Sequence, residues 1–375
     1  MTDQEISWKR VLVIAGSVVA YYMGAGYATG QEMLQYFAAY GLISLVSCVI
    51  YFLFFWYLND NFMVAGHQGY FENGMQQVCR YFCGKYIGSF YDWFATIFCY
   101  LCFVVMCSGG GAVLWQQYGL PTWVGVLLIA VTGVATVVFG LGKMVDVIGC
   151  MGPVLILLCI ASAVLGIIFA DTGISRGSEL APTLDIMKAA PSWWQAIISD
   201  IGFAIMWMVA FFAGIGRQEK TFKNARYGAL LGIFMVSLAF GIVSLAEIAN
   251  IEMIQNSQAP LLLIINNISP MAAHVYSVVV FLGVYTTACS LLWTSVNRIA
   301  EEKTTKYRLL TIVLGVAGFF IAVALPFNRL VNIVYVINGY VGFIFAVFVV
   351  ARNVRDYLAR KVAEADTYDD TVYRS

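Results

Sequence analysis

The first long apolar stretch of this chain is interrupted in its middle, and this limits the possible folds more than any other feature. The stretch begins at Val11 and has the length of a membrane-crossing helix, but residues 22–32 read Tyr-Met-Gly-Ala-Gly-Tyr-Ala-Thr-Gly-Gln-Glu. Glycine costs a helix interior about 1 kcal/mol, and unpaired backbone groups are costlier still in hydrocarbon. A break at bilayer depth is stable only where the freed N–H and C=O groups face protein, water or a ligand. The segment is therefore predicted to border a binding site, as broken membrane helices do in transporters.

The composition places the chain in a membrane. Hydrophobic residues make up 61% of it and charged residues 11%, against roughly 25% charged residues in soluble domains. The formal net charge is zero, so no nucleic-acid partner is expected. The nine cysteines fall mostly in apolar stretches and are interpreted as packing residues. The chain has no His-Glu-x-x-His motif and no P-loop, so an enzyme is not predicted.

Ten stretches have about the 20 apolar residues that a membrane crossing needs. A more polar stretch at 62–86 separates the second from the third, and a polar linker at 171–192 separates the fifth from the sixth. The predicted crossings are 11–38, 41–58, 89–116, 121–140, 147–170, 193–215, 227–250, 272–299, 307–326 and 330–351.

The basic residues agree with this order of crossings. With the N-terminus inside, 18 of the 21 Lys and Arg residues lie in cytoplasmic segments, and the other 3 (Arg176, Lys188 and Arg329) lie outside. Cytoplasmic loops of membrane proteins carry such an excess of positive charge. Both termini are therefore predicted to be cytoplasmic, including a tail at 352–375.

The ten crossings divide into two repeats of similar length, 11–170 and 193–351. Five crossings is an odd number, so the two repeats must have opposite orientations in the membrane. The sixth crossing also looks interrupted, because residues 199–202 read Ser-Asp-Ile-Gly. The prediction is one all-α integral membrane domain with ten transmembrane helices, a 5+5 inverted repeat, and breaks in helices one and six.

This pattern resembles the amino acid–polyamine–organocation superfamily, whose inverted-repeat fold is also that of LeuT-type sodium symporters. The Gly24-Ala25-Gly26 step is similar to the Gly-x-Gly break of helix one in that superfamily, and the run from Gly24 to Glu32 resembles the YkvI-like branch. The resemblance implies a cell-membrane protein whose small-molecule solute is an amino acid or a related amine.

A break at Gly24–Gly26 would leave the amides of Ala25, Gly26 and Tyr27 at the start of the second half of helix one. Free N–H groups and the helix dipole favour an anion there, such as a substrate carboxylate. The alternative is that Gly26 and Gly30 form a small-residue seam for helix packing.

The resemblance also implies a sodium site. In LeuT-type symporters the ion lies between helix eight and carbonyls that precede the break in helix one. By position, its ligands here would be the carbonyls of Ala20, Met23 and Gly283 and the hydroxyls of Thr286 and Thr287. The alternative is that the threonines only bond back to their own helix. Crossing five has no Lys or Arg, and proton-coupled relatives tend to carry a lysine there, which favours Na+ over H+.

Two carboxylates inside crossings, Asp200 and Glu32, are functional candidates because a buried charge is expensive in a membrane. Asp200 would bind a substrate amine, carry a proton or pair with Arg329 in a gate, unless it is a solvated helix-end residue. Glu32 would likewise form a gate with Arg329. Glu247 and Asp92 lie near the ends of crossings and are expected at the membrane interface.

The walls of the substrate pocket are predicted on crossings three, six and eight. Aromatic residues and Met at helical spacing are more often simple bundle packing, and the Ser-Gly-Gly-Gly run at 108–111 allows close approach of either a helix or a substrate. Apolar walls favour a small, partly apolar amino acid. The candidate wall residues are Tyr100, Phe103, Val104, Phe203, Met206, Trp207 and Tyr285.

The predicted function is sodium-coupled secondary transport of a small amino acid or related organic solute by alternating access around helices one and six. A proton-coupled transporter of the same class is one alternative. The other is a receptor that keeps the fold and senses its ligand without transporting it.

Overall fold

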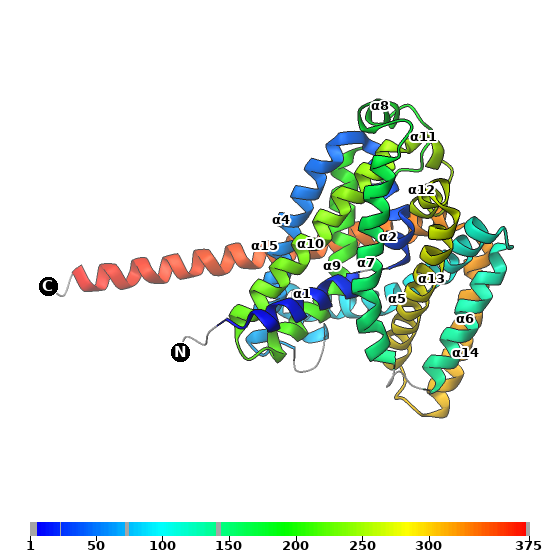
Figure 1. Ribbon diagram of the computed structural model, residues 1–375. Coiled ribbons are helices and arrows are strands. Elements are labelled where there is room, and N and C mark those ends of the chain that lie inside the picture. Colours follow the sequence, from blue (N-terminus) through cyan, green and yellow to red (C-terminus); the bar gives the residue numbers. More distant parts are fainter. Residues whose placement is uncertain (1–5, 23, 72–74, 140–143, 373–375) are drawn as a thin grey trace.

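The computed structural model describes residues 6–22, 24–71, 75–139 and 144–372, and every element in these ranges is helical (Figure 1). The elements are α1 (Trp8–Tyr22), α2 (Ala25–Thr29), α3 (Gln31–Tyr36), the 3-10 helix η1 (Ala38–Ile43), α4 (Ser44–His67), α5 (Met75–Tyr118), α6 (Thr122–Phe139), α7 (Met144–Ile168), α8 (Ile174–Leu180), α9 (Trp193–Gln218), α10 (Phe222–Ala249), α11 (Ile251–Ile254), α12 (Pro260–Ile268), α13 (Pro270–Asn297), α14 (Thr305–Ala324) and α15 (Phe327–Val372).

Eight helical stretches in the described residues are long and apolar enough to cross a membrane, which confirms the all-α integral membrane prediction. Two further helices give shorter stretches: α1 has 15 residues, and Val154–Ile168 of α7 is a shorter apolar stretch among the described residues. These two match crossings one and five of the sequence prediction. The count of ten crossings and the division into inverted repeats stay predictions.

The predicted break in helix one is confirmed. The helix α1 ends at Tyr22, and Gly24 is extended, with φ −106° and ψ −177°, before α2 begins. A second interruption follows at Gly30, whose φ of 86° lies in the left-handed region that glycine adopts without strain. Helix one therefore consists of three pieces, α1, α2 and α3, and its middle piece has only 5 residues.

The predicted break in helix six is wrong, because α9 is one continuous helix of 26 residues. The glycine at 202 serves close packing instead. A Cβ atom added to Gly202 would lie 1.9 Å from the carbonyl oxygen of Gly339, and one added to Gly339 would lie 2.2 Å from the carbonyl oxygen of Ser199. The backbones of α9 and α15 thus touch at this crossing, as small residues allow between membrane helices.

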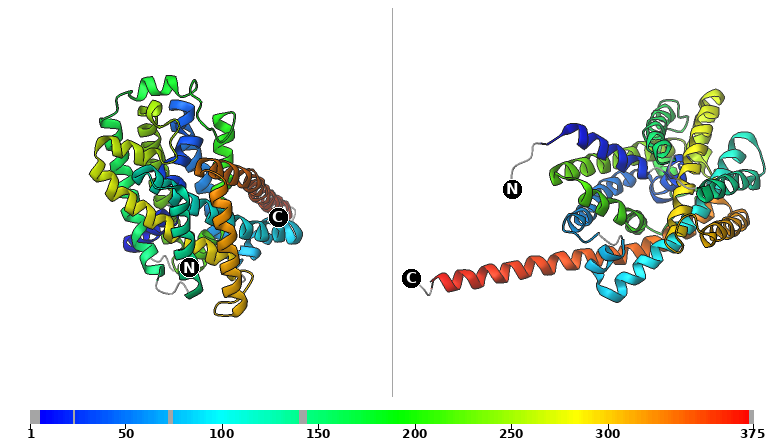
Figure 2. Two further views of the ribbon diagram at one scale, coloured as in Figure 1. Left: turned by 90° about the vertical axis from the view of Figure 1, so that its right-hand side faces the viewer. Right: turned by 90° about the horizontal axis from the view of Figure 1, so that it is seen from below.

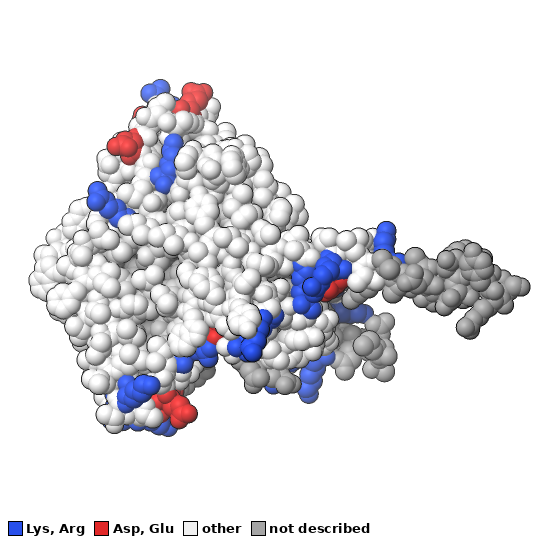
Figure 3. All heavy atoms as spheres, turned by 180° about the vertical axis from the view of Figure 1, so that it is seen from behind, with Lys and Arg blue, Asp and Glu red and all other residues white. Residues whose placement is uncertain are grey.

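The helices form one bundle, and the face seen in Figure 3 has a wide uncharged band. Short helices α8 and α11 cap one end, and α1 begins toward the other (Figure 1). Side-chain ion pairs fasten helices near the latter end: Arg10 on α1 to Glu219 after α9, at 2.5 Å, and Arg226 on α10 to Asp60 on α4. The helix α15 leaves the bundle and continues through the predicted tail (Figure 2).

Candidate functional site

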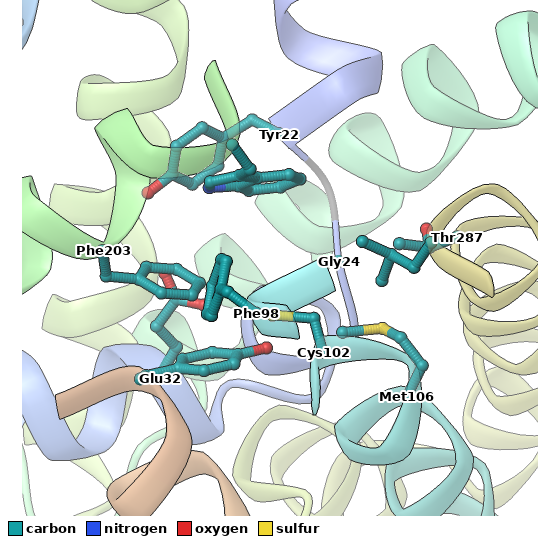
Figure 4. A pocket seen from close by; sticks show the side chains of 11 residues that line it. Tyr22, Gly24, Glu32, Phe98, Cys102, Met106, Phe203 and Thr287 are labelled. Atoms are coloured by element: carbon teal, nitrogen blue, oxygen red, sulfur yellow. The ribbon is translucent and has the colours of Figure 1, made fainter. Parts of the chain in front are cut away.

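A small cavity of about 20 Å³ lies beside the first interruption of helix one (Figure 4). That volume holds about one water molecule or one ion. It is lined by residues from both ends of the break and from α3, α5, α9, α13 and α15. The lining residues are Tyr22, Gly24, Glu32, Phe98, Cys102, Met106, Phe203, Trp207, Thr287, Leu291 and Tyr335.

Glu32 on α3 brings a carboxylate to this cavity. Its side chain is 4% exposed, and its Oε1 atom has no hydrogen-bond partner. Space for it comes from Gly26, where an added Cβ would lie 2.6 Å from Oε2 of Glu32 and 3.1 Å from the Tyr335 ring. The Gly26 position therefore admits a carboxylate and an aromatic ring, in addition to any role in helix packing.

Asp200 on α9 lies behind the cavity wall. It is fully buried, and neither of its oxygens has a hydrogen-bond partner, so it is not a solvated helix-end residue. Its charge acts on Glu32 and on the hydroxyls of Tyr22 and Tyr51. Tyr51 donates a 2.8 Å hydrogen bond to the hydroxyl of Tyr22, which links the surroundings of Asp200 to the cavity.

The site therefore has two buried carboxylates near each other, and none of the described lining residues is basic. Two uncompensated negative charges at this depth would be very costly. Such carboxylates are stable at this depth only if they are protonated or paired with a cation.

Arg329 does not supply that charge. It is exposed, while both oxygens of Asp200 and Oε1 of Glu32 have no partner. The predicted gate between Arg329 and either carboxylate is not formed in this structure.

The break in helix one rests on α5. An added Cβ at Gly109 would lie 2.9 Å from Cβ of Ala25, so the glycine run on α5 serves packing. The Ala25 amide, predicted to bind a substrate carboxylate, donates to the sulfur of Met106 at 3.4 Å. Thioether sulfur is a weak acceptor that a carboxylate could replace. The Gly26 and Tyr27 amides follow in the same first turn of α2.

Of the predicted sodium ligands, the structure brings Thr287 to the cavity, across from Glu32 (Figure 4). The hydroxyls of Thr286 and Thr287 both donate to the carbonyl oxygen of Gly283 at 2.9 Å, as the alternative interpretation expected. A hydroxyl whose proton is used in this way keeps lone pairs free to face a cation. Thr286, Gly283 and Ala20 do not line the cavity. Met23 lies outside the described residues.

Two of the predicted wall residues, Phe203 and Trp207, line the cavity. The others point elsewhere. Phe103 packs toward Gly318 of α14, Met206 toward Gly342 of α15, and the Tyr285 hydroxyl lies 2.6 Å from that of Thr136 on α6.

The sequence reasoning chose the wrong face of α5. The lining residues there are Phe98, Cys102 and Met106, which lie four apart and so share one side of the helix. This spacing was visible in the sequence, but several faces of a buried membrane helix are apolar, and apolarity alone does not pick one. Leu291 and Tyr335 were also missed.

The described residues hold no catalytic arrangement around the one serine-centred motif of the chain. Residues 173–177 read Gly-Ile-Ser-Arg-Gly, the spacing of a hydrolase nucleophile elbow. Ser175 is exposed on the short helix α8, however, and the two histidines are engaged elsewhere. His67 stacks on Phe222, and His274 stacks on Tyr118. No base is placed to activate the serine.

Comparisons with known proteins agree with a transport architecture. No family model matches the chain. The uncharacterized protein YyaD of Bacillus subtilis is 25% identical over 338 residues, covering 88% of this chain and 92% of YyaD. The uncharacterized membrane protein YkvI of Bacillus subtilis is 20% identical over 336 residues, covering 89% and 92%.

Among solved structures, mutants of the manganese transporter of Eremococcus coleocola superpose with a TM-score of 0.54 at 13% sequence identity. The match covers 92% of this chain and 79% of the transporter. The chain has the fold of a membrane transporter. At this identity the likeness concerns the fold, and the solute has to be inferred from the site.

Proposed function

We propose that the protein is a secondary active transporter of a small organic solute with an amine group, such as an amino acid, coupled to Na+. We place it in the amino acid–polyamine–organocation superfamily, near YkvI, in the cell membrane with both termini cytoplasmic. The main alternative is a transporter of the same class that is coupled to H+.

One observation carries the proposal: the break at Gly24 borders a small cavity that is also lined by the buried carboxylate of Glu32. Broken membrane helices are stable where freed backbone groups meet a ligand. The carboxylates Glu32 and Asp200 suit a substrate amine, and five aromatic rings suit its apolar part and its positive charge. Those rings belong to Tyr22, Phe98, Phe203, Trp207 and Tyr335.

The size of the cavity implies a cycle of closed and open states. About 20 Å³ admits a water molecule or an ion but no amino acid. A solute would enter only after α2 and α3 move relative to α5 and α9. Alternating access supplies such a movement, and the two interruptions of helix one supply places for it to bend.

Sodium coupling predicts a difference between two adjacent threonines. Thr287→Val should raise the Na+ concentration for half-maximal uptake about tenfold or more, because one oxygen ligand to a charge is lost. Thr286→Val is the matched control, since Thr286 makes the same bond to Gly283 but does not line the cavity. The assay is uptake into proteoliposomes under a Na+ gradient. Equal effects of the two variants would contradict sodium binding at Thr287.

The solute class is tested by thermal stabilisation of the detergent-purified protein with each of the twenty amino acids, in Na+ and in choline. A ligand that stabilises only in Na+ supports the proposal. Stabilisation that depends on pH and not on Na+ would move the coupling to the carboxylates. Binding without uptake would identify a ligand-sensing receptor, and the absence of any saturable uptake would refute transport.

A second candidate solute is a divalent transition-metal ion. The cavity has the volume of an ion, and it offers the carboxylate of Glu32, the thiol of Cys102 and the thioether of Met106. However, the described residues contain no group of three His, Cys, Asp or Glu side chains that could hold a metal, which leaves the organic solute ahead. Stabilisation by Mn2+ but by no amino acid would reverse this order.

A further inference from the structure

A third buried carboxylate lies outside the cavity and has no role in the proposed site. Glu247, in the last turn of α10, is fully buried, and neither of its oxygens has a hydrogen-bond partner in the structure. It lies near the end of a crossing, as expected, but α11 and α12 fold over this end of α10 and enclose it.

Glu247 contacts the second interruption of helix one. An added Cβ at Gly30 would lie 2.3 Å from Oε1 of Glu247 and 3.0 Å from the backbone nitrogen of Leu261 on α12. The left-handed residue between α2 and α3 is therefore held between a carboxylate and a neighbouring backbone. Only a residue without a side chain fits this space, which is the physical reason for glycine here.

Two phenols complete the surroundings of Glu247. Tyr27 of α2 and Tyr276 of α13 lie within electrostatic range of its carboxyl group. The Tyr27 hydroxyl has no partner. The Tyr276 hydroxyl donates to the carbonyl oxygen of Ala28 at 2.6 Å and lies 3.2 Å from the sulfur of Cys159 on α7. The cluster thus ties α2 to three helices around it.

Among the described residues, no positive charge faces this cluster. The ionisable groups that surround Glu247 are Tyr27, Tyr276, Cys159 and, through Tyr27, Glu32. The ionisable residues of α8 and α11, which also pack here, are Arg176, Glu179 and Glu252, and all three are exposed. The helix α12 has none. The basic residues Arg10 and Arg226 lie toward the opposite end of α10, about 30 Å along the helix.

We propose that Glu247 is a proton-binding site, distinct from the cavity, and that its proton holds α2 and α3 in the closed arrangement. A buried carboxylate without a partner is favoured in its neutral form. A metal ion in its place would need several oxygens and its own volume, whereas the space beside Gly30 is already filled. A proton needs neither.

Loss of this proton leaves a negative charge buried against Gly30. Water must then reach the carboxylate, so α2 and α3 have to separate from α10 and α12. Raising the pH is therefore expected to open the α2–α3 segment. This inference concerns the conformation of helix one and does not depend on which solute the cavity carries, or on whether it carries one.

The test is hydrogen–deuterium exchange of the purified protein, read by mass spectrometry on peptides within 25–36, without any added solute. After correction for intrinsic exchange, the equilibrium constant for opening of the wild-type segment should increase with pH. The increase should be up to about tenfold per pH unit over the range in which opening releases the Glu247 proton, as linkage to one proton requires. Glu247→Gln, neutral and of the same shape, should keep low-pH protection at every pH. Glu252→Gln, an exposed carboxylate on the neighbouring helix α11, should behave as the wild type.

Three outcomes would overturn the proposal. The first is wild-type exchange in this segment that does not change with pH, a result that needs no variant to fold. The second is a pH dependence that persists in Glu247→Gln. The third is a pH dependence abolished by Glu32→Gln instead, which would place the proton in the cavity. A failure of solute uptake with the exchange behaviour intact would refute the transport proposal alone.

Discussion

The crossing of α9 and α15 allows a sharp test of the fold, through Gly202→Ala. The new Cβ would lie 1.9 Å from the carbonyl oxygen of Gly339 and 2.5 Å from the backbone nitrogen of Phe343. Both distances are far below van der Waals contact, and both atoms belong to backbone that cannot rotate away. The two helices must therefore move apart by more than 1 Å, roughly the deficit from ordinary contact.

The magnitude follows from two opposing effects. Replacing a helix-interior glycine by alanine stabilises a helix by about 1 kcal/mol. Overpacking costs about 1–3 kcal/mol, and the upper end applies because both contacts are with backbone. The net loss is about 2 kcal/mol. At about 2 °C per kcal/mol, the melting temperature should fall by about 4 °C.

Gly214→Ala is the matched control on the same helix. Its new Cβ would meet nothing closer than a ring carbon of Phe71, at 3.5 Å, an ordinary contact. It should therefore keep the helix gain of about 1 kcal/mol and raise the melting temperature by about 2 °C. The assay is thermal unfolding of both purified variants in the same detergent.

Equal stability of the two variants would refute the reasoning. It would mean that α9 does not rest on α15 at Gly202, and that the glycine serves a broken helix six instead. The functional consequence is also specific, because Phe203, the next residue, stacks on Tyr335 with ring centroids 4.0 Å apart in the cavity wall. A shifted crossing should weaken ligand binding in Gly202→Ala and leave it unchanged in Gly214→Ala.

Two further predictions concern α5. Cys102 lines the cavity and Cys99 does not, so a stabilising ligand should slow modification of Cys102 by a membrane-permeant thiol reagent and leave Cys99 unaffected, as read by peptide mass spectrometry; equal protection would contradict this assignment. Asp92 on α5 is buried and forms an ion pair with Arg298, whose side chain is 38% exposed. Asp92→Asn should lower stability by about 1–2 kcal/mol, less than for a fully buried pair, and a double-mutant cycle with Arg298→Gln should show coupling; additive effects would rule out the pair.

The break in helix one could be predicted because it is a local property. Glycine, threonine and charged residues at bilayer depth are unfavourable in any continuous helix, whatever surrounds them. The structure places the interruption at Gly24, as expected, and adds a second at Gly30. For Gly202 the predicted break was wrong, since a glycine suits a helix break and close helix packing equally well. Its role depends on whether Gly339 lies opposite, far along the chain.

The candidate site was predicted in part for the same reason. Glu32, Asp200 and Thr287 stood out as polar groups inside apolar crossings, and all three lie at or near the cavity. Of the aromatic walls, Phe203 and Trp207 were predicted but Phe98 and Tyr335 were not, because the helices that carry them are apolar on several faces. The burial of Glu247 was not predicted, because its position near a helix end says nothing about the short helices that cover it.

The sequence alone determined the membrane environment, the all-helical class and the interruption of the first helix, because each depends on how short stretches of residues interact with hydrocarbon. Only the tertiary structure decided which face of α5 meets the cavity, that α9 is continuous, and that the carboxylates of Asp200 and Glu247 are buried without hydrogen-bond partners. Those features depend on contacts between residues far apart in the chain. Burial and the absence of a partner are properties of a residue's surroundings, and the type of a residue does not specify what surrounds it.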